Sequence, residues 1–160
     1  MTEAPTDEGW IRLLGEMDDL ASRKATDGWD TLTIPAGDAG PEGPNAGLAD
    51  RHGYAYVVPG DAADAFVERF DPGQGRFPET ELYRRATPEK LYMLTVFKNP
   101  QTDVAILLAG VLDRTGEAFA RCREAAEQTG RMHSHLFRVD GTHLGSFEHA
   151  DSAPFFPDFQ

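Results

Sequence analysis

Two long apolar segments separated by a short polar turn constrain the fold of this chain more than any other feature. Residues 90–98 (KLYMLTVFK) are densely apolar, and residues 102–112 (TDVAILLAGVL) are apolar nearly throughout. A strand that is apolar at almost every position is typical of a sheet covered on both faces. Periodicity alone would also allow a buried helix over 102–112. The β-branched residues and the Asn99-Pro100-Gln101 turn favour an antiparallel pair of buried strands.

The rest of the chain alternates between helical and strand patterns around this pair. Its apolar spacing predicts helices over residues 8–27, 62–70 and 115–129, and strands over residues 29–34, 54–58, 79–86, 131–139 and 142–149. Residues 36–47 contain four glycines and two prolines, which predicts a loop. Short turns between adjacent strands predict an α+β fold. We expect one mostly antiparallel sheet of about six or seven strands with three helices packed on it, as a two-layer sandwich.

The length of 160 residues fits a single domain. We expect residues 1–7 to be disordered, residues 8–150 to form the one α+β domain, and residues 151–160 to form an aromatic C-terminal tail. Burial of Phe155, Phe156 and Phe159 would each be worth about 1.5–3 kcal/mol. The tail is therefore expected either to fold back over the sheet or to serve as an interaction site for a partner.

Charge is the most informative part of the composition. Acidic residues outnumber basic ones by 27 to 15, which gives a formal net charge of −12. Such a charge costs stability through self-repulsion, and molar salt removes most of that cost by shortening the Debye length to about 3 Å. The composition therefore favours a halophile, with an ordinary acidic protein from a GC-rich genome as the alternative. Nucleic-acid binding is not favoured, because phosphate contacts need clustered Lys and Arg.

Several classes of protein are excluded by features that the sequence lacks. The longest apolar run, at residues 104–112, has nine residues, whereas a membrane-spanning helix needs about 20. The first residues are acidic and polar, so no secretory signal is expected and the expected compartment is the cytoplasm. Cys122 is the only cysteine, which excludes an intrachain disulfide and a cysteine-based zinc site. On its predicted helix it is expected to be a small core residue.

A predicted hairpin brings histidines together near the end of the chain. Asp140-Gly141 is a strong signal for a two-residue turn, and the resulting register places His133 opposite Glu148 and His135 opposite Ser146. Because side chains alternate along a strand, His133, His135 and Glu148 would share one face. Two imidazoles and a carboxylate form a ligand set that zinc or ferrous iron accepts, so a divalent metal is a possible cofactor.

The alternative is a solvated hairpin face that bears ordinary surface histidines, and a one-residue slip of the register would move every side chain to the other face. His143 and His149 are expected on the opposite face, where buried histidines are usually satisfied by hydrogen bonds. The sequence leaves the metal site and the solvated face open.

The densest basic region of the chain surrounds Tyr83-Arg84-Arg85. On a strand, Arg84 and Arg85 could present a positive stripe to an anion or to an acidic partner. The alternative is scattered charge that balances the neighbouring Glu79, Glu81 and Glu89.

Three segments of the chain also resemble a known family. The features are Gly28-Trp29-Asp30, the strand pair LYMLTVFKNPQTDVAILLAGVL and the HADSAPFF ending. Together they resemble a family of small acidic haloarchaeal proteins that is classed as a domain of unknown function. The resemblance covers about residues 8–156. It implies a halophilic habitat and a one-domain protein, and it supplies no catalytic residues.

No motif in the sequence is specific enough to name a reaction. The function we expect is therefore a non-enzymatic, cytoplasmic protein-interaction or regulatory module, which binds another protein or a second copy of itself. One alternative is a small metal-binding protein or metal-dependent enzyme that uses His133, His135 and Glu148. A further alternative is a small-ligand sensor with a pocket under residues 36–47.

Overall fold

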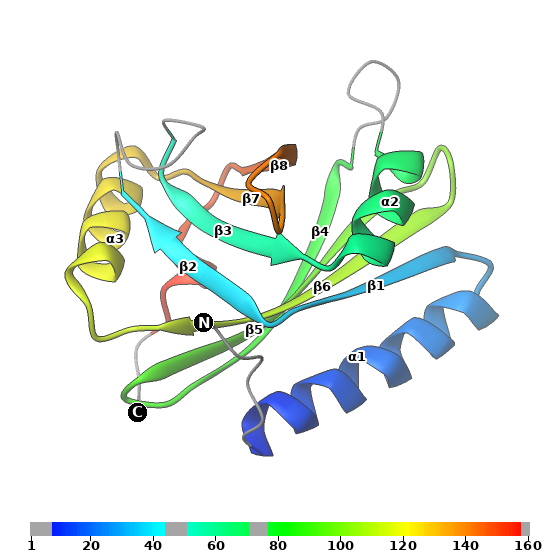
Figure 1. The fold of residues 1–160 in the computed structure, drawn as a ribbon, viewed down its shortest axis with the longest axis horizontal. Coiled ribbons are helices and arrows are strands. Elements are labelled where there is room, and N and C mark those ends of the chain that lie inside the picture. Colours follow the sequence, from blue (N-terminus) through cyan, green and yellow to red (C-terminus); the bar gives the residue numbers. More distant parts are fainter. Residues whose placement is uncertain (1–7, 44–50, 71–76, 158–160) are drawn as a thin grey trace.

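The structure is a computed structural model that describes residues 8–43, 51–70 and 77–157 (Figure 1). In this part of the chain, the elements in order are α1 (Glu8–Thr26), β1 (Asp30–Ala36), β2 (Asp38–Glu42), β3 (Gly53–Val58), α2 (Gly60–Arg69), β4 (Glu79–Ala86), β5 (Lys90–Asn99), β6 (Val104–Asp113), α3 (Glu117–Thr129), β7 (Met132–Arg138), β8 (His143–His149) and a short 3-10 helix (Ala153–Phe155). Every predicted helix and strand is present within a few residues of its expected bounds. None of the described helices is long and apolar enough to cross a membrane.

The strands form two mixed sheets of four strands each. Sheet A has the order β1-β6-β5-β4, and sheet B has the order β2-β3-β7-β8. The antiparallel pairing of β5 with β6 confirms the strand pair predicted from the apolar segments. However, β1 runs parallel to β6 and β3 runs parallel to β7. The prediction of one mostly antiparallel sheet of six or seven strands is therefore wrong, while the α+β class and the three helices agree with the structure.

The wrong sheet prediction has two physical causes. Strand β2 lies inside the Gly- and Pro-rich segment that was expected to be a loop, and Pro41 is compatible with it because β2 pairs on one side only, with β3. Each parallel pair joins strands that are far apart in the sequence. Reasoning from short turns between consecutive strands cannot find such pairs.

The apolar residues of sheet A serve two separate cores, as expected for strands that are covered on both faces. Leu94 and Leu107 face α1, whereas Met93 and Ile106 face sheet B. Figure 1 shows α1 lying along one face of sheet A, with sheet B on the other side. Trp10, Leu13, Met17 and Leu20 form the buried stripe of α1.

The core between the two sheets is closely packed. The rings of Phe97 on β5 and Phe147 on β8 stack with centroids 3.8 Å apart. A Cβ atom at Gly110 would lie 2.5 Å from the ring of Tyr56, so only glycine fits where β6 passes β3. Phe66 of α2 and Phe119 of α3 are buried in the same core. This packing leaves the outer faces and the edges of the sheets as the places where a site could lie.

Candidate functional site

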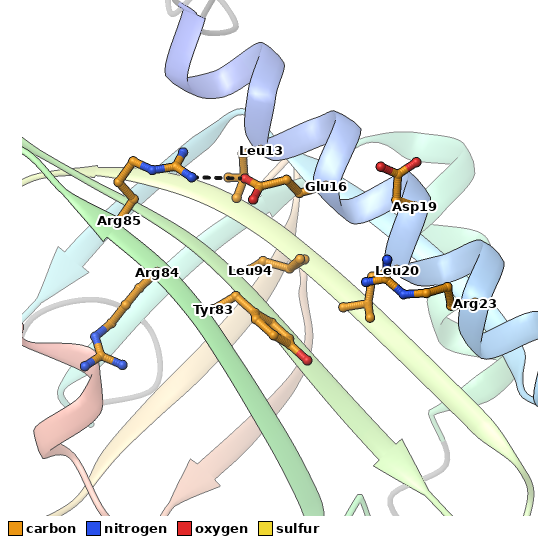
Figure 2. Close-up of a pocket in the computed structure, with 9 residues that line it drawn as sticks. All are labelled: Leu13, Glu16, Asp19, Leu20, Arg23, Tyr83, Arg84, Arg85 and Leu94. Atoms are coloured by element: carbon orange, nitrogen blue, oxygen red, sulfur yellow. Dashed lines mark hydrogen bonds and ion pairs between the residues drawn. The ribbon is translucent and has the colours of Figure 1, made fainter.

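One hollow of the described surface is a groove between α1 and the edge of sheet A. Its volume is about 390 Å³. Figure 2 shows the residues that line it, which come from α1, β4 and β5: Leu13, Glu16, Asp19, Leu20, Arg23, Tyr83, Arg84, Arg85 and Leu94. The leucines form an apolar floor, and the charged side chains lie along the rim. The groove is therefore amphipathic.

Helical spacing and strand alternation together build this groove. Along α1, Leu13 and Leu20 face the sheet, while Glu16 and Arg23 lie one turn further along the same side. On β4, alternate residues pair with β5 residues of the α1-facing core, and Tyr83 lies opposite Leu94. The groove thus combines two elements about 60 residues apart in the sequence, which no local pattern could have brought together.

The structure separates the two arginines that the sequence suggested as an anion site. Arg85 faces α1, where its Nη2 lies 3.5 Å from Oε1 of Glu16. Arg84 pairs with Met93, which faces the other core, and in Figure 2 its side chain points away from α1. The expected role of Arg84 and Arg85 in anion or acidic-partner binding stays a prediction. The two side chains would meet a ligand from opposite faces of β4.

An ion cluster next to the groove explains part of the local charge. Glu81 Oε2 lies 2.5 Å from Nζ of Lys98 and 3.1 Å from Nζ of Lys24, and the hydroxyl of Tyr83 donates to Oε1 at 2.9 Å. Burial alone would raise the pKa of Glu81. The hydrogen bonds from Lys98, Lys24 and Tyr83 outweigh burial and lower the pKa to about 2. Glu81 is therefore ionised at neutral pH.

Two arginines of the groove are left outside these pairs. Arg23 and Arg84 form no ion pair with any residue in the described part of the chain. Tyr83, which lies between them in the groove, is 46% exposed. Its aromatic ring is therefore available for burial against a partner. The groove thus offers cations and an aromatic ring in a chain whose net charge is −12.

The second candidate site is the outer face of sheet B, where the predicted hairpin register is confirmed. His133 lies opposite Glu148, and His135 lies opposite Ser146. The imidazole rings of His133 and His135 lie nearly parallel, at an interplanar angle of 6°, with centroids 5.5 Å apart. Both histidines are buried. The face is therefore not a solvated row of surface histidines.

Both ring nitrogens of His135 are hydrogen-bonded inside the protein. Nε2 lies 3.0 Å from the carbonyl oxygen of Arg51, which can only accept, so Nε2 carries the proton. Nδ1 then accepts from the hydroxyl of Ser146 at 2.6 Å. Burial lowers the pKa of His135 to about 4, so the ring is neutral at pH 7. To bind a metal, His135 would have to give up one of these bonds.

His133 is less well satisfied than His135. Its Nε2 lies 3.8 Å from Oε2 of Glu148, and its buried Nδ1 has no hydrogen-bond partner. Burial lowers its pKa. Across residues 8–43, 51–70 and 77–157, no group of three or more His, Cys, Asp or Glu side chains is arranged to hold a metal ion. A metal site at His133, His135 and Glu148 stays a prediction.

A β-bulge places His143 on a different face from the one expected. The register shifts between Leu136 and Phe137, so His143 lies on the same face as Ser146, and its Nε2 donates to Ser146 Oγ at 2.7 Å. The expectation that His143 lies on the opposite face is wrong. His149 does lie there, buried, with its Nε2 2.8 Å from Oγ of Ser134.

The aromatic tail packs on its own domain as far as the structure describes it. Phe155 and Phe156 are 3% and 8% exposed and contact Tyr54 and Phe119 in the core between the sheets. The third predicted interaction residue, Phe159, lies outside the described residues. Phe155 and Phe156 could contact a partner only after leaving the core, so their interaction role stays a prediction.

Cys122 is buried against β3, where its Sγ lies 3.4 Å from the carbonyl oxygen of Gly53. Burial raises its pKa to about 12, as expected for an unreactive core cysteine. A second, shallower hollow of about 280 Å³ lies beside Ala39 of β2 and the end of β6. It is the feature closest to the ligand pocket that we expected under residues 36–47.

By its fold, the protein is an α+β sandwich of two mixed sheets, and it has an amphipathic groove along one sheet edge. The chain belongs to the Family of unknown function (DUF7529), whose model matches residues 2–157. No curated protein and no solved structure matches the chain. The resemblance to a family of unknown function is thereby confirmed, and the family supplies no site residues.

Proposed function

We propose that this protein is a non-enzymatic, cytoplasmic protein-interaction module that binds an extended segment of a partner along β4 and in the adjoining groove. The single observation that carries the proposal is that β4 is an eight-residue sheet edge with neither proline nor bulge, beside an amphipathic groove. An extended segment can add to such an edge through main-chain hydrogen bonds while its alternate side chains enter the groove.

The comparison of the four edge strands supports β4 as the binding edge. Native proteins protect edge strands with proline, with bulges or by keeping them short. Strand β1 contains Pro35, β2 contains Pro41 and has five residues, and β8 is interrupted by its bulge. Strand β4 has eight residues, no proline and an unbroken ladder with β5. Within the described chain, it is the edge that has neither proline, bulge nor short length, and its protection comes from its charged side chains.

The groove supports a partner that carries carboxylates. Its rim holds the side chains of Arg23 and Arg85 against Glu16 and Asp19, and Arg85 already shares its charge with Glu16. A carboxylate of the added segment could bind Arg23 or Arg85 by a charge-assisted hydrogen bond. This arrangement agrees with the acidic partner that the sequence suggested.

Capture experiments with an edge-blocking variant test the proposal. Tyr83→Lys adds a lysine to the edge strand at an exposed position, and Val67→Lys in α2, at 49% exposure, is its matched control. From a lysate of the source cells in molar KCl, we expect the wild type and Val67→Lys to retain the same stoichiometric protein and Tyr83→Lys to lose it. Equal retention by all three proteins, or no retained protein, would contradict the proposal.

One observation favours metal binding as a second candidate function. The buried Nδ1 of His133 lacks a hydrogen-bond partner, and such an atom is available to a ligand. Calorimetric titration with Zn²⁺ tests this candidate. Saturable binding that disappears in His133→Ala and persists in His52→Ala would support it, whereas absence of binding to the wild type would reject it.

A further inference from the structure

We infer that the partner at the β4 edge is a second copy of this chain, paired antiparallel through β4 about a two-fold axis. This inference rests on the proposed function, because it names the occupant of the same edge and groove. Its basis is the distribution of charge along β4. The strand has Glu79 and Glu81 in its first half and Arg84 and Arg85 in its second half.

A strand with this charge order is complementary to itself only when the second copy runs antiparallel. The acidic half of each strand then faces the basic half of the other. A parallel arrangement in register would place like charges side by side, which is destabilising. The charges of β4 therefore select one orientation of one partner, whereas charges placed only to keep an edge soluble would not need this order.

The register follows from the alternation of side chains. Residues directly opposite each other in an antiparallel pair lie on the same face, so a two-fold axis must pair odd with odd and even with even residues along β4. With the axis at Leu82, Glu79 lies opposite Arg85 of the partner subunit, Glu81 opposite the partner's Tyr83, and Leu82 opposite its own copy.

Other registers fit less well. Moving the axis to Glu81 places the two Glu81 carboxylates opposite each other, and moving it to Arg84 does the same for two arginines. An axis at Tyr83 pairs Glu81 with Arg85, but Glu81 is already bound by Lys24 and Lys98. The carboxylate of Glu79 is 50% exposed, with one contact to Lys98 at 3.4 Å. The register with Leu82 at the axis therefore uses the more available carboxylate.

The groove adds a second set of contacts to this pairing. Glu79, Tyr83 and Arg85 all lie on the α1-facing side of β4, because they pair with Lys98, Leu94 and Tyr92 of β5. The partner's Glu79 would thus reach Arg85 at the groove, and the second strand would cover part of the exposed ring of Tyr83. Two copies of sheet A would become one continuous sheet with both α1 helices on the same face.

Charge-reversal variants test this pairing. Arg85→Glu alone would place two pairs of glutamates opposite each other in the dimer, and Glu79→Arg alone would place two pairs of arginines. An equimolar mixture of the two variants restores a Glu–Arg pair at both ends. Sedimentation equilibrium of the wild type, of each variant and of the mixture measures the dissociation constants.

We expect the wild type to dimerise, each variant alone to dissociate at least about tenfold more readily, and the mixture to return to near the wild-type constant. Because association in the mixture needs both chains folded, it also excludes misfolding as the cause of dissociation. A monomeric wild type, or a dimer that neither variant weakens, would overturn the inference. If the wild type is monomeric but still retains another protein that Tyr83→Lys does not retain, the second copy is ruled out as the partner and the proposed function stands.

Discussion

The outer face of sheet A and the four histidines of β7 and β8 (His133, His135, His143 and His149, the histidine cluster) both include titratable side chains held away from water, but in opposite charge states. On sheet A, Glu81 stays ionised because two lysines and a tyrosine hydroxyl donate to it. On sheet B, His135 stays neutral because burial lowers its pKa and its hydrogen-bond partners, the Ser146 hydroxyl and the carbonyl of Arg51, carry no charge that would stabilise a protonated ring. Burial opposes charge at both places, and the neighbours decide whether the charge survives.

The two faces also differ in how many of their polar groups are free to bind a partner. The histidine cluster uses most of its polar atoms in bonds within the protein, with the Nδ1 of His133 as an exception. The groove and the β4 edge leave Arg23 of α1 and Arg84 of β4 without an ion pair among the described residues and leave Tyr83 half exposed. For this reason we propose sheet A as the interaction site and regard the buried histidines, His133, His135 and His149, chiefly as part of the folded core.

Lowering the pH should produce the largest change in the free energy of unfolding, through the buried histidines of sheet B. Burial lowers the pKa of both His135 and His149 from 6.5 to about 4. The unfolded chain then binds more protons than the folded one between these values, so stability is full above pH 6.5 and is lost as the pH falls through 4. At pH 5 the loss should be about 2 kcal/mol for each histidine. Urea unfolding at pH 7 and pH 5 measures it.

The variant His135→Asn tests the contribution of one of the two histidines. His135→Asn should unfold more readily at pH 7, but its stability should change about half as much between pH 7 and pH 5. Equal free energies of unfolding of the wild type at the two pH values would show that the histidines are not held neutral.

Removal of the charge of Glu81 should have the next largest effect, on sheet A. Glu81→Gln weakens three hydrogen bonds to an ionised group, and we expect a loss of about 2 kcal/mol at pH 7. The matched control, Glu79→Gln, removes a half-exposed carboxylate and should cost less than about 1 kcal/mol. Similar losses for both variants in urea unfolding would contradict the distinction between them.

Glu81 also titrates in a different range from the histidines. Its folded pKa of about 2 is below its ordinary value of 4.5, so its contribution is present above 4.5 and is lost as the pH falls through 2. Between pH 7 and pH 5, His135 and His149 should therefore respond and Glu81 should not.

Salt should have a smaller effect on both faces. The net charge of −12 causes self-repulsion, which molar KCl screens. We expect the melting temperature at pH 7 to rise by a few degrees between low and molar KCl, which corresponds to about 1 kcal/mol for a domain of this size. A melting temperature that does not rise would contradict the halophilic habitat that the composition favours.

The smallest effects on stability should come from the two arginines of β4. Arg85→Ala loses one partly exposed ion pair with Glu16 and should cost about 0.5 kcal/mol. Arg84→Ala loses no ion pair of the described chain and should cost less. Both variants should leave the histidine-dependent pH response unchanged, and a changed response would show that the two faces are coupled.

Local patterns were sufficient to predict most elements and part of the histidine cluster. The Asp140-Gly141 turn fixed the register from Met132 to Leu136, so the positions of His133 and His135 opposite Glu148 and Ser146 were correct. The bulge near His143 could not be predicted, because nothing in the residues next to the turn requires an extra residue. Burial of the cluster also depends on Arg51, which is distant in the sequence.

The division into two sheets and the groove could not be predicted for a related reason. Pro41 and Gly40 indicate a loop by local propensity, whereas pairing with β3 makes them part of an edge strand. The groove needs α1 to pack over β5 and β6 beside β4, and no local pattern records that packing. The sequence did indicate Arg84 and Arg85, and strict alternation on a strand was the signal that could have placed them on opposite faces.

Amide hydrogen exchange of the wild type, at low and at high protein concentration, tests most directly whether molecules meet at β4. Every second amide of an edge strand points outward and exchanges unless another strand accepts its hydrogen bond. We predict that alternate amides between residues 79 and 86 gain protection at high concentration, while those of β7 and β8 do not change. Unchanged exchange in β4, or protection gained only along β8, would contradict the account.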